Sequence, residues 1–555
     1  MASRKDPYEY PGNTREKVKQ KHAELETNKK EMKALLDAKK DHIKEPILDM
    51  KATEISAKVK DGSLKAEDAL VTFVDRCFHY IDRNFIADFI LEAFQDVAKL
   101  TDEKKASPIY AVPISLKECI GVKGHDTTFG LLKHSFCPAK EDAVIVKVLR
   151  SVGAIPFMTT SMAQGGLDLD CSNPLFGLQR NAHFEGYLGG GSSGGEGIAL
   201  GLKASILGVG TDIGGSIRFP AAFNGVCSLK PTVRRLSMRG VLDPFLTHCL
   251  QLQITIGPLG RFVEDLVNFM KATLCPLLFQ LDPLVIPLPF NNDLYEGSHK
   301  LKIGYFTCFK QTKDNAMVIP VPAVQRAVQE SADKLKNLGY DVVEFEVPTP
   351  EYAYSLYARA IFNDAGYALI EMMKNEPFNQ DYMQIKQLIG QPSFVKSKCS
   401  FVAEWMFGPQ VETGVKATAG SKSGKSAGEL LKAIHDYVHV FLDAMGDIDL
   451  LLSPIYSVPV ARKDVLDVIN KSMIPYAAMY NLLEMPAGVL PVTKTTQDDL
   501  DKAQALAKKF HEAKDKVNAK VFETQDKLGL PVSVQVAAKP YREELVLRVM
   551  KALET

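Results

Sequence analysis

Residues 189–218 read GGGSSGGEGIALGLKASILGVGTDIGGSIR, and this stretch sets the architecture of the chain. It opens with a loop of five glycines and two serines over residues 189–195. The small residues that follow predict a helix over 196–203, and the apolar run 204–210 predicts a buried strand. Residues 211–216, rich in glycine, predict a turn, and a further helix begins at Ile217. The stretch is therefore a strand between two helices, with a glycine–serine loop on each side.

The same alternation continues on both sides of this stretch. Upstream, residues 109–116 predict a strand that runs into Lys117, and a helix (143–152) and a buried strand (154–158) follow. Downstream, strands are predicted over 301–306, 340–345 and 447–452, and an amphipathic helix is predicted over 322–338. Alternating elements of this length indicate an α/β fold with a largely buried sheet. Ligands usually bind at the loops that follow the carboxyl ends of such strands.

The N-terminal region has a different composition. Residues 13–45 contain ten Lys or Arg and seven Asp or Glu. Val18, Leu25 and Met32 lie seven residues apart and predict one thin apolar stripe along a long helix that lies on the main body. A short coiled coil or dimerisation element, or contact with a membrane surface, remain alternatives. We expect a charged helical extension over 1–54 and one large domain over 55–555.

Composition excludes several classes of protein. Lys plus Arg and Asp plus Glu number 67 each, so the chain lacks the positive excess of a nucleic-acid-binding protein. Hydrophobic residues make up 46% and charged residues 24%, which is typical of a globular chain. Nine cysteines without a C-x-x-C pair indicate reduced thiols. A polar N-terminus and the lack of a run of about 18 apolar residues predict neither signal peptide nor transmembrane helix. We expect a cytoplasmic protein or one on a cytosol-facing membrane surface.

The glycine–serine loop 189–195 has several interpretations. A flexible linker is one, but a buried helix and strand follow it at once. A phosphate-binding loop would need the pattern G-x-x-x-x-G-K-[ST], which is absent here. A look-alike at 420–426 has Ala419 where the first glycine belongs, and no strand is predicted before it, which indicates a solvated loop.

A nucleophile elbow is a further interpretation, since Gly190–Gly194 formally fits G-x-S-x-G. An elbow requires a hydrophobic strand just before it, and residues 181–188 are not strand-like. It also requires a histidine to complete a triad. The downstream histidines do not follow predicted strands: His248, His299, His435, His439 and His511.

Taken together, the two serine loops and the strand-end lysine resemble the amidase signature family. The matching motifs are KEC (117–119), GGSSGGEG (190–197), GTDIGGSIRFPA (210–221) and LKPT (229–232). Within that family, four further blocks resemble fatty acid amide hydrolases: DCSNPLFG (170–177), LDP with PLPF (281–290), MPAGVLPVT (485–493) and GLPVSVQ (529–535). The resemblance covers roughly residues 55–555. It implies a large mixed β-sheet core surrounded by helices.

The resemblance also implies a set of catalytic residues. Ser216 is the implied nucleophile, Ser192 the proton bridge, and Lys117 the final base and acid. Serine is a poor nucleophile without an adjacent base. A lysine acts as a base only when its amine is neutral, and burial at a strand end favours the neutral form. The family needs no cofactor, and the sequence contains no H-E-x-x-H and no cysteine–histidine cluster for a metal.

The turn before Ser216 has an expected role of its own. Its two glycines let backbone N–H groups converge on one point as an oxyanion hole, formed by Ile213, Gly214, Gly215 and Ser216. We interpret Asp212 and Arg218 as a supporting ion pair and Ser193 as a hydrogen-bonding neighbour.

The chain departs from the family in several places. The membrane-spanning N-terminal helix of some relatives is absent, and Leu188 and Gly189 stand where proline or serine is usual. Gly166 occupies a position that touches substrate in relatives, so only its backbone can do so here. Residues 393–428 do not clearly match the family's hydrophobic membrane cap. Apolar residues there, with Trp405, indicate either core packing or a weakly lipid-facing lip: Phe394, Val395, Phe401, Val402, Met406 and Phe407.

The leading hypothesis for function is a serine hydrolase of fatty acid amides such as N-acylethanolamines and primary amides. Monoacylglycerol esters are further candidate substrates. Two alternatives remain: an amidotransferase-type subunit that releases ammonia to a partner, and an inactive scaffold. The expected partner is a small lipid amide, without nucleic acid, and peripheral membrane contact and a homodimer remain open.

Overall fold

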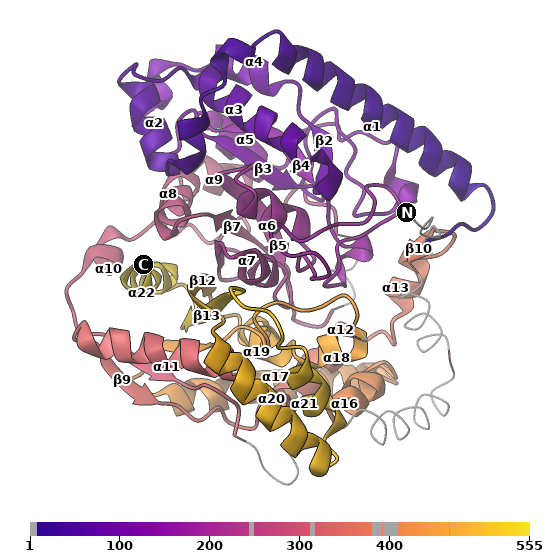
Figure 1. Cartoon of the computed structure of the whole chain (residues 1–555), viewed down its shortest axis with the longest axis vertical. Coiled ribbons are helices and arrows are strands. Elements are labelled where there is room, and N and C mark those ends of the chain that lie inside the picture. Colours follow the sequence, from indigo (N-terminus) through magenta and orange to yellow (C-terminus); the bar gives the residue numbers. More distant parts are fainter. Residues whose placement is uncertain are drawn as a thin grey trace.

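The computed structural model describes residues 8–243, 249–310, 317–379, 391, 409–465 and 467–554. In this part of the chain one mixed sheet of 11 strands runs through the molecule (Figure 1). Its strands, in spatial order, are β2 (Ile86–Phe89), β4 (Ile155–Thr160), β3 (Pro113–Lys117), β5 (Leu207–Asp212), β7 (Thr255–Gly260), β6 (Cys227–Lys230), β12 (Ala487–Lys494), β13 (Pro531–Ala538), β11 (Leu450–Pro454), β8 (Lys302–Tyr305) and β9 (Asp341–Glu344). A separate pair is formed by β1 (Tyr8–Glu9) and β10 (Phe378–Asn379). The predicted α/β fold with a large mixed sheet is confirmed.

The first half of the sheet positions the strand ends that matter for chemistry. β3 lies between β4 and β5 and is parallel to both. Lys117, at the end of β3, is paired with Thr160 at the end of β4. Because the carboxyl ends of parallel strands meet at one edge of a sheet, the loops after β3, β4 and β5 come together there.

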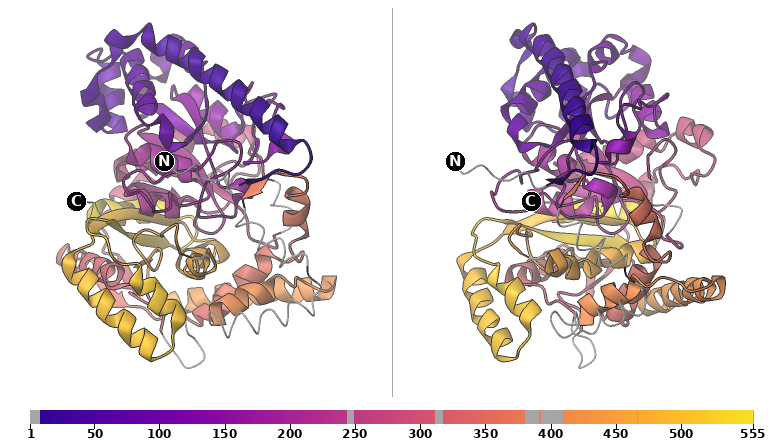
Figure 2. Two further views of the ribbon diagram at one scale, coloured as in Figure 1. Left: turned by 45° about the vertical axis from the view of Figure 1, so that its right-hand side comes forward. Right: turned by 90° about the vertical axis from the view of Figure 1, so that its right-hand side faces the viewer.

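Helices surround this sheet, as Figures 1 and 2 show. Those from the N-terminal half are α1 (Thr14–Asp37), α2 (Ala52–Lys60), α3 (Ala66–His79), α4 (Ala93–Ala98), α5 (Val144–Ser151), α6 (Gly194–Gly201), α7 (Arg218–Asn224), α8 (Val263–Thr273), α9 (Pro276–Leu281) and α10 (Asn292–Glu296). Those that follow are α11 (Pro322–Asn337), α12 (Pro350–Ile361), α13 (Tyr367–Met372), α16 (Pro409–Ala417), α17 (Gly424–Met445), α18 (Asp467–Ser472), α19 (Pro475–Leu482), α20 (Gln497–Glu512), α21 (Lys516–Glu523) and α22 (Glu543–Leu553). α1 and the α20–α21 pair lie at opposite ends of the molecule.

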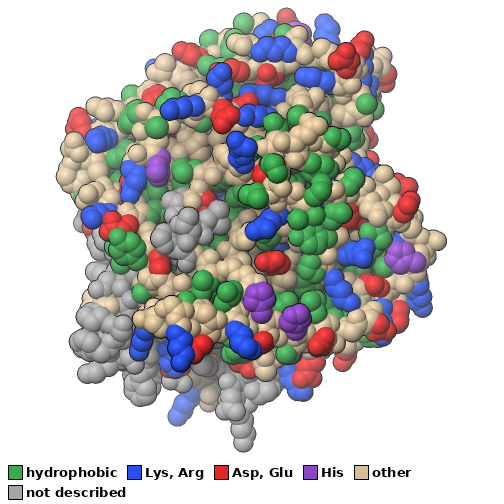
Figure 3. All heavy atoms as spheres, turned by 180° about the vertical axis from the view of Figure 1, so that it is seen from behind, with side chains coloured by type: hydrophobic (Ala, Val, Ile, Leu, Met, Phe, Trp, Pro, Cys, Tyr) green, Lys and Arg blue, Asp and Glu red, His purple; other side chains and the backbone are tan. Residues whose placement is uncertain are grey.

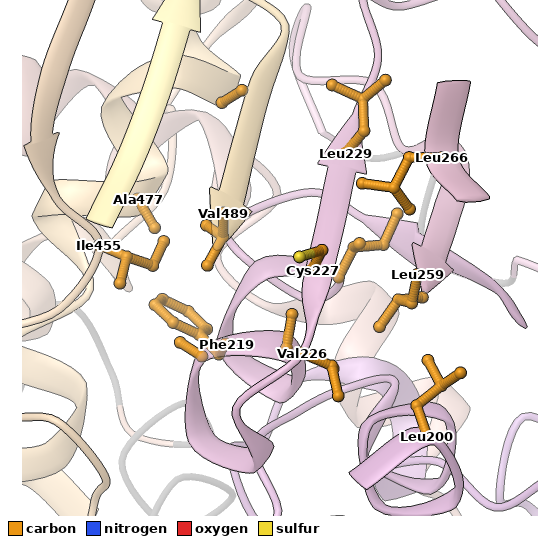
Figure 4. Close-up of a cluster of buried hydrophobic side chains, with 14 of the residues drawn as sticks. Leu200, Phe219, Val226, Cys227, Leu229, Leu259, Leu266, Ile455, Ala477 and Val489 are labelled. Atoms are coloured by element: carbon orange, nitrogen blue, oxygen red, sulfur yellow. The ribbon is translucent and has the colours of Figure 1, made fainter. Parts of the chain in front are cut away.

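The short helix α7 joins the two halves of the core. Figure 4 shows Phe219 of α7 pointing toward Ile455 and Val489 from the C-terminal half, while Leu229 and Leu259 extend the cluster into the first half. Phe219 is 2% exposed. Full burial of such a side chain contributes roughly 1.5–3 kcal/mol. The helix that begins two residues after Ser216 is therefore fixed by packing on both sides.

The long N-terminal helix lies on the body of the molecule, as predicted. Val18, Leu25 and Met32 are buried, and Met32 and Leu36 join the main hydrophobic core. The apolar stripe is thus covered by the rest of the chain, which leaves it no free face for a coiled coil. The division into 1–54 and 55–555 stays a prediction.

Two predicted strands differ from the observed ones at their ends. Ile109–Val112 are buried but not part of β3, which begins at Pro113. Ala111 has a φ of +60°, and this left-handed residue interrupts the extended run. β5 begins at Leu207 and continues to Asp212, so the turn that follows is shorter than predicted.

The surface mixes charges of both signs. On the face seen in Figure 3, Lys and Arg side chains are interspersed with Asp and Glu side chains. None of the described helices combines the length and apolar character needed to cross a bilayer. The apolar residues between 394 and 407, Trp405 included, lie outside the described residues. Membrane contact and a homodimer stay predictions.

Candidate active site

Lys117 occupies the end of β3 and is fully buried. Its Nζ donates to Ser192 Oγ at 2.8 Å and to Thr211 Oγ1 at 2.8 Å. Among the described residues, no carboxylate forms an ion pair with this amine. The ends of β3 and β5 and the glycine–serine loop thus bring an amine and two hydroxyls together in the interior. The sequence analysis did not predict that Thr211 contacts Lys117, although Thr211 lies within the motif GTDIGGS.

Ser192 and Ser216 lie on adjacent loops. The Ser193 N–H donates to the Ser216 carbonyl at 3.1 Å, and the Ala163 N–H donates to the Ser192 carbonyl at 3.1 Å. Exposure increases from Lys117 to Ser192, which is 3% exposed, and then to the partly exposed Ser216. The Ser216 hydroxyl makes no hydrogen bond with another described residue. The buried amine thus contacts one buried hydroxyl, and the more exposed Ser216 hydroxyl lies on the adjacent loop.

The glycine–serine loop packs too tightly for side chains. A Cβ at Gly191 would overlap the Asp168 carbonyl oxygen. Beneath the loop, the buried Cys171 Sγ lies 3.3 Å from the carbonyl oxygens of both Gly190 and Ser192, and it accepts the Gly194 N–H at 3.1 Å. Burial raises the pKa of this thiol to about 12, so it remains protonated. Cys171 lies within a motif quoted above, but nothing local in the sequence indicated that it supports Ser192.

Asp212 and Arg218 form the predicted ion pair, with both side chains fully buried. Arg218 Nη2 lies 3.0 Å from Asp212 Oδ1, and Nε lies 3.0 Å from Oδ2. Burial alone would raise the pKa of Asp212, but the guanidinium outweighs it and holds that pKa well below its usual range. Asp212 also accepts the N–H groups of Gly215 at 2.8 Å and Ile217 at 3.1 Å. The pair therefore fixes the backbone on both sides of Ser216.

This arrangement changes the expected oxyanion hole. The Gly215 N–H already donates to Asp212, because the turn folds back so that the carboxylate caps it. The N–H groups of Ile213, Gly214 and Ser216 have no acceptor among the described residues, and the oxyanion hole itself stays a prediction. Gly215 has a φ of +122°, which favours glycine at this position.

Tyr357 of α12 packs against the same turn. Its hydroxyl donates to the Ile213 carbonyl at 3.4 Å, and a Cβ at Gly214 would overlap it. Tyr357 lies far from the turn in sequence, so only the fold could identify it.

Gly166 lies in the segment beside Ser192. It ends the 3₁₀ helix Gln164–Gly166, is partly exposed, and donates its N–H to Ala163 at 3.0 Å. A Cβ there would lie 2.8 Å from Phe129 Cζ. Its contact with substrate stays a prediction.

The alternative interpretations of the loops find no support in the geometry. In the described chain no strand leads into Gly190–Gly194, as an elbow would require. No described histidine bonds to Ser192 or Ser216, and His248 lies outside the described residues. The loop at 420–426 follows α16 rather than a strand, and α17 begins within it at Gly424. Ser193 is a hydrogen-bonding neighbour as predicted, since its Oγ donates to the Thr211 carbonyl at 3.3 Å.

Comparisons with known proteins identify the family of this chain. The family model Amidase matches residues 68–547. Fatty-acid amide hydrolase 1 of Sus scrofa is 34% identical over 92% of this chain and 86% of its own length. Fatty acid amide hydrolase 1 of Caenorhabditis elegans is 33% identical over 85% and 82%. A solved fatty acid amide hydrolase structure shares the fold with a TM-score of 0.76 at 22% identity, covering 97% of this chain and 94% of that one. The chain belongs to the amidase signature family and is a hydrolase that acts on amides.

Proposed function

We propose that this amidase is a serine hydrolase of fatty acid amides that works through Lys117, Ser192 and Ser216. The proposal depends above all on the hydrogen bond of 2.8 Å between Lys117 Nζ and Ser192 Oγ, with the Ser216 loop bonded alongside. A buried amine that touches only hydroxyls can exist as the neutral base that serine activation needs.

The first half of the reaction forms a tetrahedral intermediate on Ser216. Ser216 Oγ attacks the amide carbonyl carbon, while its proton passes to Ser192 and the Ser192 proton passes to Lys117 Nζ. The developing oxyanion is stabilised by the free N–H groups of Ile213, Gly214 and Ser216. Each such donor is worth about 3 kcal/mol in the transition state.

The second half returns the proton. Lys117, now an ammonium, gives a proton back through Ser192 to the amide nitrogen as the C–N bond breaks, and the amine leaves. Water then attacks the acyl carbon, again with Lys117 as the final base, and releases the fatty acid. Ser216 recovers its proton, so the enzyme ends as it began.

The substrate class is supported by similarity rather than by a bound ligand. The relatives reported above carry the name fatty acid amide hydrolase, and blocks 170–177 and 281–290 resemble that group. These blocks disfavour an amidotransferase-type subunit. N-acylethanolamines and primary amides are the proposed substrates, and monoacylglycerol esters are secondary ones.

Two measurements test the proposal. A fluorophosphonate probe followed by peptide mapping should place the adduct on Ser216, with Ser192 and Ser193 unlabelled. Hydrolysis rates across matched acyl amides, short amides and monoacylglycerols should favour long acyl amides. An adduct on another serine would overturn the catalytic assignment. A preference for short amides would overturn the substrate class, and a lack of labelling with a lack of turnover would favour the scaffold alternative.

A further inference from the structure

A buried carboxyl group lies behind the proposed base and has no part in the mechanism above. Glu196, in the first turn of α6, is fully buried. Its Oε2 accepts the Ser115 hydroxyl at 2.6 Å, and its Oε1 accepts the Thr160 hydroxyl at 2.8 Å. Ser115 Oγ also lies 3.0 Å from Ser205 Oγ. The carboxyl group is thus surrounded by hydroxyls and pairs with no described Lys or Arg side chain.

The strands place this carboxyl group on the same side as the lysine. Ser115 and Lys117 are two residues apart on β3, so their side chains share one face. Thr160 is the cross-strand partner of Lys117 on β4. Glu196 interacts electrostatically with Lys117, although the two form no direct hydrogen bond. An acid and an amine therefore lie in one buried region, and among the described residues only hydroxyl side chains hydrogen-bond to them.

Few other titratable groups face Lys117. Two thiols interact electrostatically with Lys117: Cys119, just after β3, and Cys171, beneath the glycine–serine loop. Burial raises the pKa of each thiol to about 12, so both stay neutral at ordinary pH. Glu118 directly follows β3, and its carboxylate accepts the N–H groups of Thr128 and Gly130.

The charge of Glu196 changes near neutral pH. Burial raises the pKa of Glu196 to about 7, against the opposing effects of Ser115, Thr160 and Lys117. Its ionised form favours the ammonium form of Lys117, and its neutral form does not.

We propose that Glu196 is a positioning residue that sets the pH at which Lys117 becomes a base. The inference rests on the proposed function, since it concerns the base of that reaction. An anionic Glu196 holds a proton on Lys117 and delays activity to higher pH. Removing the negative charge lets the amine lose its proton at lower pH, so the acid limb of the rate profile moves downward.

The test is the dependence of kcat/KM on pH for an oleoyl amide. Glu196→Gln keeps the shape of the side chain and removes its charge, and it should move the acid limb to lower pH by roughly one unit. Ser115→Ala removes one donor to the carboxylate, which makes ionisation harder, and should move the limb in the same direction by less. Asp265→Asn is the matched control. Burial raises the pKa of Asp265 to about 7 as well, but this carboxyl group accepts the Ala52 N–H far from Lys117.

The outcomes separate this inference from the proposed function. An acid limb that stays in place in both Glu196→Gln and Ser115→Ala would overturn the role of Glu196, as would an equal shift in Asp265→Asn. If Glu196→Gln does not fold, as judged by thermal unfolding, Ser115→Ala decides alone. Lys117→Ala tests the proposed mechanism separately. If this variant keeps the wild-type acid limb, Lys117 is not the base and the proposed mechanism is wrong.

Discussion

Two buried basic side chains, Arg218 and Lys117, belong to the Ser216 region and have different hydrogen-bonding partners. Arg218 donates hydrogen bonds to Asp212, the Ala477 carbonyl, Gln535 and Asn481. Lys117 is equally buried, but among the described residues it donates only to the hydroxyls of Ser192 and Thr211. Arg218 is bound by a carboxylate and three neutral groups, whereas Lys117 contacts no carboxylate in the part of the chain that the structure describes.

The difference follows from the chemistry of the two groups. A guanidinium stays charged in a protein, so its burial requires a partner. A lysine can lose its proton, and a hydroxyl environment is then sufficient for it. Arg218 is therefore suited to hold the backbone around Ser216 in place, and Lys117 is suited to exchange a proton. Several substitutions test this contrast.

The largest effect is expected at the nucleophile itself. Ser216→Ala removes the atom that attacks the substrate and should lower kcat on the order of 10⁶-fold. Steady-state turnover and loss of fluorophosphonate labelling measure this, with Ser193→Ala as the matched control that keeps the label. Retained turnover in Ser216→Ala would show that Ser216 is not the nucleophile, and the roles given to Lys117 and Arg218 would then fail.

The next largest effect is a difference in thermal stability between variants of Arg218 and variants of Lys117. Arg218→Met leaves Asp212 as an unpaired buried charge, which should cost about 3–5 kcal/mol and lower the thermal midpoint clearly. Lys117→Met leaves no buried charge behind and should change the midpoint little. The double variant with Asp212→Asn should recover part of the loss. Equal losses in the two single variants would mean that Lys117 is also held as a permanent cation.

A smaller effect is expected from the second partner of Lys117. Thr211→Val keeps the shape and removes the hydroxyl that accepts from Nζ at 2.8 Å. Loss of one such hydrogen bond is worth about 1 kcal/mol, so kcat should fall roughly 5-fold with little change in KM. Thr159→Val, on β4, is the control. A change confined to KM would contradict the orienting role.

The smallest effect is expected beneath the glycine–serine loop. Cys171→Ser keeps one donor and acceptor but shortens the reach to the Gly190 and Ser192 carbonyls, and kcat should fall roughly 2- to 3-fold. Cys171→Ala removes all three contacts and should lose more. If Cys171→Ser is as impaired as Cys171→Ala, then the packing of the sulfur atom supports the loop and its hydrogen bonds do not.

The sequence predicted those features that are written in local patterns. The two serine loops, the strand-end lysine and the Asp212–Arg218 pair are carried by short motifs, and the structure brings their residues together. Element ends were less predictable, because one left-handed residue, Ala111, shortens β3 without leaving a pattern.

Features that depend on distant contacts could not be predicted. Tyr357 reaches the Ile213 turn from α12, and its sequence neighbourhood is that of an ordinary amphipathic helix. The capture of the Gly215 N–H by Asp212 depends on the exact path of the turn, which spacing alone does not determine. The sequence named Glu196 only as part of a motif, and its hydroxyl shell comes from three separate elements.

The most direct test of the central claim is the pH dependence of Lys117→Ala on a matched oleoyl amide and ester. General acid–base assistance is worth 10²–10⁴-fold, so kcat/KM should fall by about that factor, and further for the amide, whose amine must be protonated to leave. Wild-type rates should rise as the amine loses its proton and then level off. The variant should follow hydroxide concentration to high pH. Equal losses on both substrates with an unaltered pH profile would contradict a lysine that takes and returns the proton.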